Sequence, residues 1–136
     1  MSTPITWILI GITALNSYAA FQNSSLLEKQ LFHPAIMKEP KEWYRFISHG
    51  FVHGDFQHLL FNMLTLFFFG PYIEATFDQI FENAAMYPTF YLGGLIFSSI
   101  PSYFKHKNDY YYRALGASGA IASLLFTTIM FDPWQT

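Results

Sequence analysis

Four apolar stretches without a charged side chain most strongly constrain how this 136-residue chain can fold. They cover residues 5–21, 59–73, 84–104 and 115–131, and none contains Asp, Glu, Lys or Arg. A membrane-spanning helix needs about 20 mostly apolar residues, within a range of about 17–25. The second stretch reaches that length if its helix starts near Asp55. We therefore expect an all-α membrane protein with spans at about residues 5–21, 55–73, 84–104 and 115–131.

The composition supports a multi-pass integral membrane protein. Charged residues make up 12% of the chain, whereas a soluble domain usually carries about 25%. A soluble all-α protein is the alternative, but four such stretches are hard to fit around one small core. The first stretch could also be a signal peptide. No Lys or Arg precedes Lys29, however, so the positive start of a signal peptide is missing and a retained span is favoured.

Net charge and cysteine content exclude several function classes. A net charge of −2 gives no basis for nucleic-acid binding, and we expect no nucleic-acid partner. The absence of cysteine excludes disulfides, thiolate metal sites and a cysteine nucleophile. We expect no cofactor and no metal. Histidines 49 and 53 are four residues apart and could bind zinc from one helical face, but Gly50 and Gly54 disfavour a regular helix there.

The longest polar interval, residues 22–56, mixes charged side chains with Trp43, Tyr44 and other large apolar residues. This mixture is typical of short amphipathic helices that lie at a membrane interface, where aromatic rings are enriched. A plain solvated loop is the alternative. All seven Lys and Arg residues lie in this interval or in residues 105–113. The positive-inside rule would therefore place both loops in the cytoplasm.

Two polar positions inside the apolar stretches stand out. His58 and Asn62 are four residues apart, so a helix would bring them to one face. Polar groups inside a bilayer are costly and usually functional. Ser118 lies between Gly116 and Gly119, which clear space around its hydroxyl. The same small residues could instead let two helices approach closely, and both interpretations can hold together.

These features together resemble the rhomboid family of intramembrane serine proteases, over roughly residues 43–131. The stretch R-F-I-S-H-G-F-V-H at residues 45–53 is similar to the family's first-loop motif, and H-L-L-F-N at residues 58–62 to its H-x-x-x-N helix. Gly70 and Glu74 match a G-x-x-x-E pattern. G-A-S-G at residues 116–119 matches the family's G-x-S-G nucleophile motif.

The resemblance implies a rhomboid-like helical bundle that cleaves transmembrane protein substrates within the lipid bilayer. Ser118 would be the nucleophile, and Gly116 would set the geometry of the nucleophile loop. His58 and Asn62 would stabilise the oxyanion together with the backbone N–H of Ser118. His53 matches a family histidine with a structural role. We expect a location in a bacterial inner membrane, with both loops outside, against the positive-inside rule.

The sequence departs from the family in one respect. The family's general base is a histidine on its sixth span, whereas this chain has no histidine after Ser118. We therefore expect residues 1–136 to be a C-terminally truncated rhomboid domain with four of six spans. We expect this truncated chain to be inactive alone and its longer parent protein to be active. The alternative function is a non-catalytic rhomboid-like protein that binds transmembrane partners.

Overall fold

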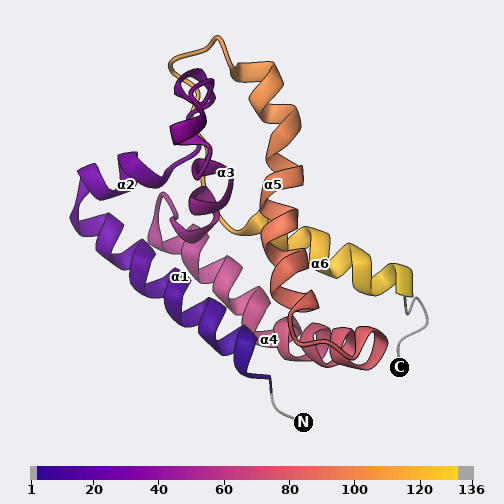
Figure 1. Ribbon diagram of the computed structural model, residues 1–136. Coiled ribbons are helices and arrows are strands. Elements are labelled where there is room, and N and C mark those ends of the chain that lie inside the picture. Colours follow the sequence, from indigo (N-terminus) through magenta and orange to yellow (C-terminus); the bar gives the residue numbers. More distant parts are fainter. Residues whose placement is uncertain (1–2, 132–136) are drawn as a thin grey trace.

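The computed structural model describes residues 3–131, so residues 1–2 and 132–136 of the expected domain lie outside its description. Its main helices are α1 (Pro4–Gln22), α4 (Phe56–Phe81), α5 (Met86–His106) and α6 (Ser118–Phe131). The first loop adds α2 (Ser24–Gln30), α3 (Arg45–Ser48) and three short 3₁₀ helices: η1 (Pro34–Ile36), η2 (Pro40–Glu42) and η3 (His49–Phe51). The predicted all-α bundle is confirmed for the described residues (Figure 1).

The four main helices follow the four apolar stretches, with different ends. By length and hydropathy, α1 and α4 qualify as candidate spans, whereas the apolar part of α6 is shorter. Helix α5 has 21 residues, which is long enough for a span, but it is not apolar enough by the same measure. The number of membrane crossings stays a prediction. Because Gly116 has a positive φ of 113°, α6 begins at Ser118 and not at residue 115.

The buried guanidinium of Arg45 holds the first loop in its folded arrangement. The side chain of Arg45 is 6% exposed. Its guanidinium donates to the carbonyl oxygens of Glu28 at 2.7 Å and Leu31 at 2.8 Å, and to the Glu42 carboxylate at 3.0 Å. A buried charge is tolerated when it is paired and hydrogen-bonded, as here. The loop is therefore a packed layer of short helices and not a plain solvated segment.

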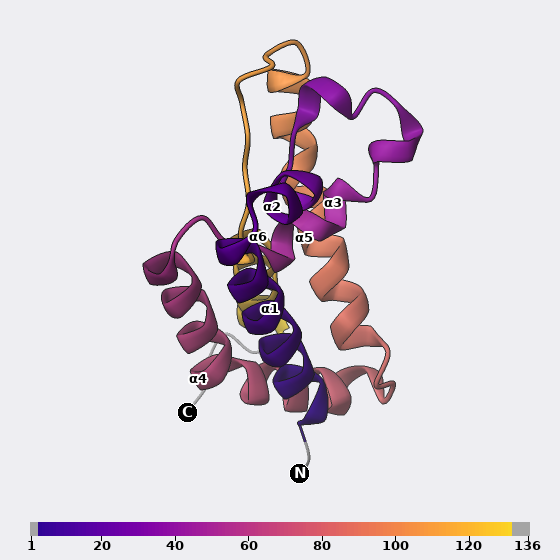
Figure 2. The ribbon, with the colours of Figure 1, turned by 90° about the vertical axis from the view of Figure 1, so that its left-hand side faces the viewer.

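The first loop is also attached to the segment between α5 and α6. Phe32 and Ala114 exchange two backbone hydrogen bonds, of 2.8 and 3.0 Å. Nearby, the His33 ring bonds to the carbonyl oxygen of Tyr110, and Lys38 donates to Asn108. Figure 2 shows this segment running from the end of α5 past the first loop toward α6. The two basic loops therefore form one end of the molecule.

A buried carboxylate joins α1 to α4 at the other end. Glu74 is 1% exposed and accepts from the backbone N–H groups of Ile5 at 3.1 Å and Thr6 at 2.9 Å, and from the Thr6 hydroxyl at 2.8 Å. The first N–H groups of a helix have no partner within it, so Glu74 caps α1 from a neighbouring helix. A Cβ atom at Gly70 would lie 2.5 Å from Thr6 Cγ2, which explains the glycine one turn earlier.

Replacing Glu74 by glutamine is expected to lower the free energy of unfolding by about 1–3 kcal/mol, because the α1 donors lose a charged acceptor. The same change at the exposed Glu82, also at the end of α4, is the matched control and should leave stability nearly unchanged. Denaturant unfolding in detergent micelles measures both. Equal stability of the two variants would contradict the capping role.

Candidate functional site

Ser118 is the first residue of α6 and is exposed, and the turn before it requires glycine. Gly116 has a φ of 113°, a conformation that L-residues with a side chain rarely adopt. A Cβ atom there would also lie 2.8 Å from His58 Cε1. The Gly116 N–H donates to the carbonyl oxygen of His49 at 2.8 Å, which fixes the turn to the first loop.

His53 bonds to the next residue of this turn, Ala117, and connects the turn to α1 and α4. Its ring is fully buried. Nε2 lies 2.9 Å from the Asn62 amide nitrogen and 3.3 Å from the backbone nitrogen of Ala117, while Nδ1 lies 3.1 Å from the Ser17 hydroxyl. Because two N–H groups point at Nε2, this atom must be the acceptor, and the ring proton is assigned to Nδ1. His53 is therefore a neutral imidazole that donates to Ser17.

The surroundings of His53 favour this neutral form. The pKa of His53 is lowered to about 4, mainly by burial and also by the nearby His58, while Asp55 acts in the opposite direction. The His58 ring lies 5.0 Å from the His53 ring, centroid to centroid. Protonation would place a third N–H group against the donors of Asn62 and Ala117, so the charged form is incompatible with the network.

The predicted site residues of α4 lie beside the turn before Ser118. Asp55 caps α4 by accepting from the backbone N–H of His58 at 2.7 Å. The half-buried ring of His58 lies against Gly116, since a Cβ atom on this glycine would be 2.8 Å from His58 Cε1. Asn62 is buried and gives one amide hydrogen to His53. An amide group carries two hydrogens, so the second remains for another acceptor.

A polar cavity of about 200 Å³ lies beside Ser118. It is lined by the His49 ring, three serines of α5 and the turn before α6: Phe32, His49, Ser98, Ser99, Ser102, Ala114, Leu115, Gly116, Ser118 and Gly119. His49 Nδ1 lies 2.7 Å from the carbonyl oxygen of Arg45, which orients the ring. Burial lowers the pKa of His49, so this ring too is favoured as neutral.

The small residues of α6 also serve helix packing, as the second interpretation of the motif proposed. A Cβ atom at Gly119 would lie 2.3 Å from Ser98 Oγ, and one at Gly94 would lie 3.1 Å from Ala120 Cα. Glycine at these two positions therefore permits the close approach of α5 and α6. Ser118 itself remains exposed beside the cavity.

The zinc alternative for His49 and His53 finds no support in this geometry. Both ring nitrogens of His53 are hydrogen-bonded, so neither is left to bind a metal. Within residues 3–131, no group of three or more His, Cys, Asp or Glu side chains is placed to hold a metal ion.

Some of the groups that position this turn were not predicted from the sequence. His53 was assigned a structural role only by resemblance, and its bond to Ala117 was not foreseen. Ser17 and the His49 carbonyl oxygen were missed. The only sequence signal for the role of His53 was its position just ahead of the H-x-x-x-N helix. No pattern in α1 indicated Ser17.

The depressed pKa of His53 predicts acid-sensitive stability. Between about pH 6.5, where a free histidine titrates, and about pH 4, the unfolded chain binds a proton that the folded chain does not. The contribution of neutral His53 to the free energy of unfolding is therefore complete above pH 6.5. It is lost as the pH falls toward 4, by up to about 3 kcal/mol.

The predicted loss of stability in acid is tested by unfolding the wild type and His53→Gln in detergent across this pH range. The stability difference between them should shrink with acidification, whereas His106→Gln, at the end of α5, should follow the wild type. A difference between wild type and His53→Gln that does not change with pH would refute the neutral network.

Comparison with known proteins agrees with this geometry. A family model described as Rhomboid domain matches residues 40–136. The chain is 36% identical over 83 residues to "Putative rhomboid protease YdcA" of Bacillus subtilis (strain 168), covering 61% of this chain and 38% of that protein. It is 40% identical over 50 residues to "Rhomboid protease GlpG" of Haemophilus influenzae, covering 37% of this chain and 26% of that protein.

A third relative, "RHOMBOID-like protein 4" of Arabidopsis thaliana, is 38% identical over 90 residues, or 66% of this chain and 21% of that protein. The chain thus spans at most about two fifths of the length of these relatives. The family match covers most of the chain and includes both the H-x-x-x-N helix and the G-x-S-G turn beside it. The chain belongs to the rhomboid family of membrane proteins.

Proposed function

We propose that this chain carries the nucleophile and the oxyanion site of an intramembrane serine endopeptidase that cleaves transmembrane proteins. The observation that carries the proposal is the position of Ser118. Its hydroxyl is exposed beside a polar cavity, and the turn before it is fixed by the His49 carbonyl oxygen and by His53. The relatives' names support protease activity at the level of the family.

The surroundings of Ser118 suit a nucleophile and a developing oxyanion. Among residues 3–131 no side chain is hydrogen-bonded to Ser118 Oγ, so the hydroxyl is available for attack. The backbone N–H of Ser118 lies in the first turn of α6, where helix N–H groups have no internal partner and the helix dipole favours negative charge. The second Asn62 hydrogen and the His58 ring would complete the set of donors.

A general base is the missing part of this chemistry, because a serine hydroxyl needs one to take its proton. His53 uses both ring nitrogens, and His33 bonds to the Tyr110 carbonyl oxygen. His106 stacks on Tyr112 at 3.6 Å. His49 shares the cavity with Ser118 but is oriented by Arg45 and makes no bond to the serine within the described residues. His58, the fifth histidine, is assigned here to the oxyanion donors, and we therefore infer that the base lies outside these 136 residues.

Hydrolysis also needs water, and the cavity beside Ser118 is a suitable source. Its volume of about 200 Å³ holds several waters at about 30 Å³ each. The α5 hydroxyls and the His49 ring offer such waters hydrogen-bond partners. Location in a bacterial inner membrane is part of this proposal; it rests on the family and on two bacterial relatives.

Cleavage of a reporter transmembrane substrate in liposomes tests the assignment of Ser118. A longer protein that contains this chain should cleave, and Ser118→Ala should abolish cleavage. Ser123→Ala, one turn further along α6, is the matched control and should retain activity.

The 136-residue chain alone should be inactive in the same assay. Cleavage by this chain that Ser118→Ala stops would mean that His49, His53 or His58 is the base, and our assignment of roles would be wrong. A longer protein that binds the reporter without cutting it would favour the non-catalytic alternative.

Removal of an oxyanion donor should slow the reaction without abolishing it. His58→Ala and Asn62→Ala in the active protein should each lower kcat by about 10²–10³-fold, since donors of this kind stabilise charge in the transition state. His106→Ala at the end of α5 should have little effect. Because Asn62 also holds His53, its variant needs a stability measurement beside kcat. A loss explained wholly by unfolding would remove Asn62 from the proposed site.

A further inference from the structure

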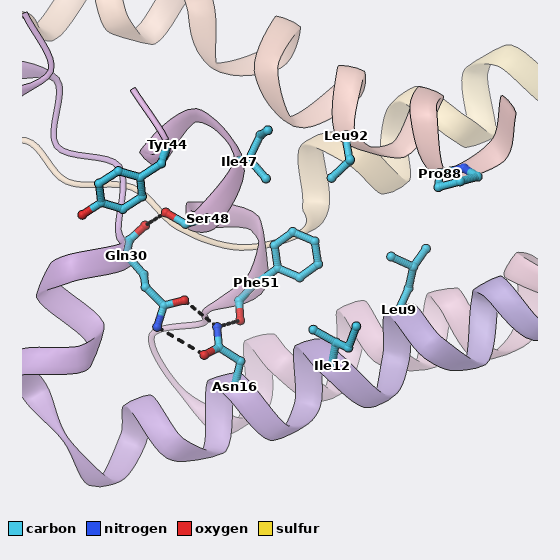
Figure 3. Close-up of a pocket in the computed structure, with 10 residues that line it drawn as sticks. All are labelled: Leu9, Ile12, Asn16, Gln30, Tyr44, Ile47, Ser48, Phe51, Pro88 and Leu92. Carbon is cyan, nitrogen blue, oxygen red and sulfur yellow. Dashed lines mark hydrogen bonds between the residues drawn. The ribbon is translucent and has the colours of Figure 1, made fainter. Parts of the chain in front are cut away.

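A second, larger groove lies away from Ser118, between α1, the first loop and α5. Its volume is about 680 Å³. Figure 3 shows Leu9, Ile12 and Asn16 of α1 along one wall, Leu92 and Pro88 of α5 opposite, and Phe51 between them. Ile12 is 52% exposed, so the groove is open to the surroundings of α1. In a membrane protein those surroundings are lipid.

The lining changes from apolar to polar along the axis of α1. Leu9, Ile12 and Asn16 lie on one face, and the rise of about 1.5 Å per residue separates the first from the last by about 10 Å. The end at Leu9 and Pro88 is hydrocarbon, whereas the end at Asn16 is shared with Gln30, Tyr44 and Ser48 (Figure 3). Because α1 is a candidate span, this gradient runs along the expected membrane normal.

The polar end offers no free donor to a polar ligand. The Asn16 amide nitrogen donates to Gln30 Oε1 at 2.7 Å and to the Phe51 carbonyl oxygen at 2.8 Å. The Gln30 amide donates to Asn16 Oδ1 and to the Leu26 carbonyl oxygen. The hydroxyls of Ser48 and Tyr44 donate to backbone carbonyl oxygens. The groove therefore suits a hydrocarbon chain and not a hydrogen-bonding solute.

The backbone of the exposed cationic residue Lys29 adjoins the polar end. The carbonyl oxygen of Lys29 accepts from the Tyr44 hydroxyl, and Lys29 precedes Gln30 in the chain. Its side chain is exposed and makes no ion pair within the part of the chain that the structure describes. The neighbouring Glu28 is paired with Arg113, so its charge is compensated. Lys29 thus complements an anionic headgroup at this level.

We propose that the groove binds an acyl chain of one anionic phospholipid, with the headgroup phosphate at Lys29. The volume supports this occupant over a further helix. It falls within the range of about 300–1,000 Å³ of small-ligand sites, whereas a spanning helix is about 10 Å wide and about 30 Å long. The site is separate from Ser118 and does not depend on the proposed protease activity.

Native mass spectrometry of the full-length protein in detergent, titrated with phosphatidylglycerol or phosphatidylcholine, tests the proposal. Ile12→Trp fills the groove from an exposed position and should weaken phosphatidylglycerol binding about tenfold or more, since loss of about two buried methylenes already does so. Leu15→Trp, on the same helix but outside the groove, is the matched control and should bind like the wild type. Equal melting temperatures of the two variants show that the fold is kept.

The headgroup is tested by Lys29→Glu against Lys105→Glu, which makes the same change of charge in the last turn of α5. Lys29→Glu should weaken phosphatidylglycerol binding at least about fivefold, since one cation near an anionic lipid has about that effect. It should weaken phosphatidylcholine binding less, because the choline cation offsets the charge of that lipid's phosphate. The proposal is overturned if Ile12→Trp binds lipid like Leu15→Trp, if Lys29→Glu behaves like Lys105→Glu, or if the groove is occupied by a second copy of the protein.

Discussion

The arrangement of this molecule depends on the hydrogen bonds made by the neutral ring of His53. It receives hydrogen bonds from Asn62 of α4 and from the backbone of Ala117, and gives one to Ser17 of α1. Three segments that are far apart in sequence thus meet at one buried side chain. Ala117 is the residue before Ser118, so the same ring that holds the bundle together also positions the proposed nucleophile.

Two further buried groups hold the ends of the bundle. Arg45 gathers the first loop around its guanidinium, and Glu74 caps α1 from α4. Both satisfy backbone groups that would be expensive to leave unpaired in a membrane. The first loop then presents the His49 carbonyl oxygen to Gly116. Stability and site geometry therefore rest on the same few polar side chains, which explains why these side chains interrupt otherwise apolar surroundings.

The helices and the neighbours of Ser118 were predicted from the sequence better than the hydrogen bonds and backbone turn that hold them in place. Uncharged stretches determine where helices form, and the spacing of His58 and Asn62 places both on one face. The start of α6 at Ser118 was not predicted, because a positive φ at Gly116 depends on contacts with His49 and His58. Ser17 was missed, since a serine in an apolar helix has no local signal for a partner 36 residues away.

The ¹⁵N chemical shifts of the His53 ring in the full-length protein test the central claim most directly. A neutral ring that accepts at Nε2 predicts a proton on Nδ1 at neutral pH, maintained until the pH falls to about 4. A ring protonated on Nε2, or one that is already charged at pH 6, would contradict the account, because Ala117 and Asn62 would then have no acceptor and the turn before Ser118 would not be held.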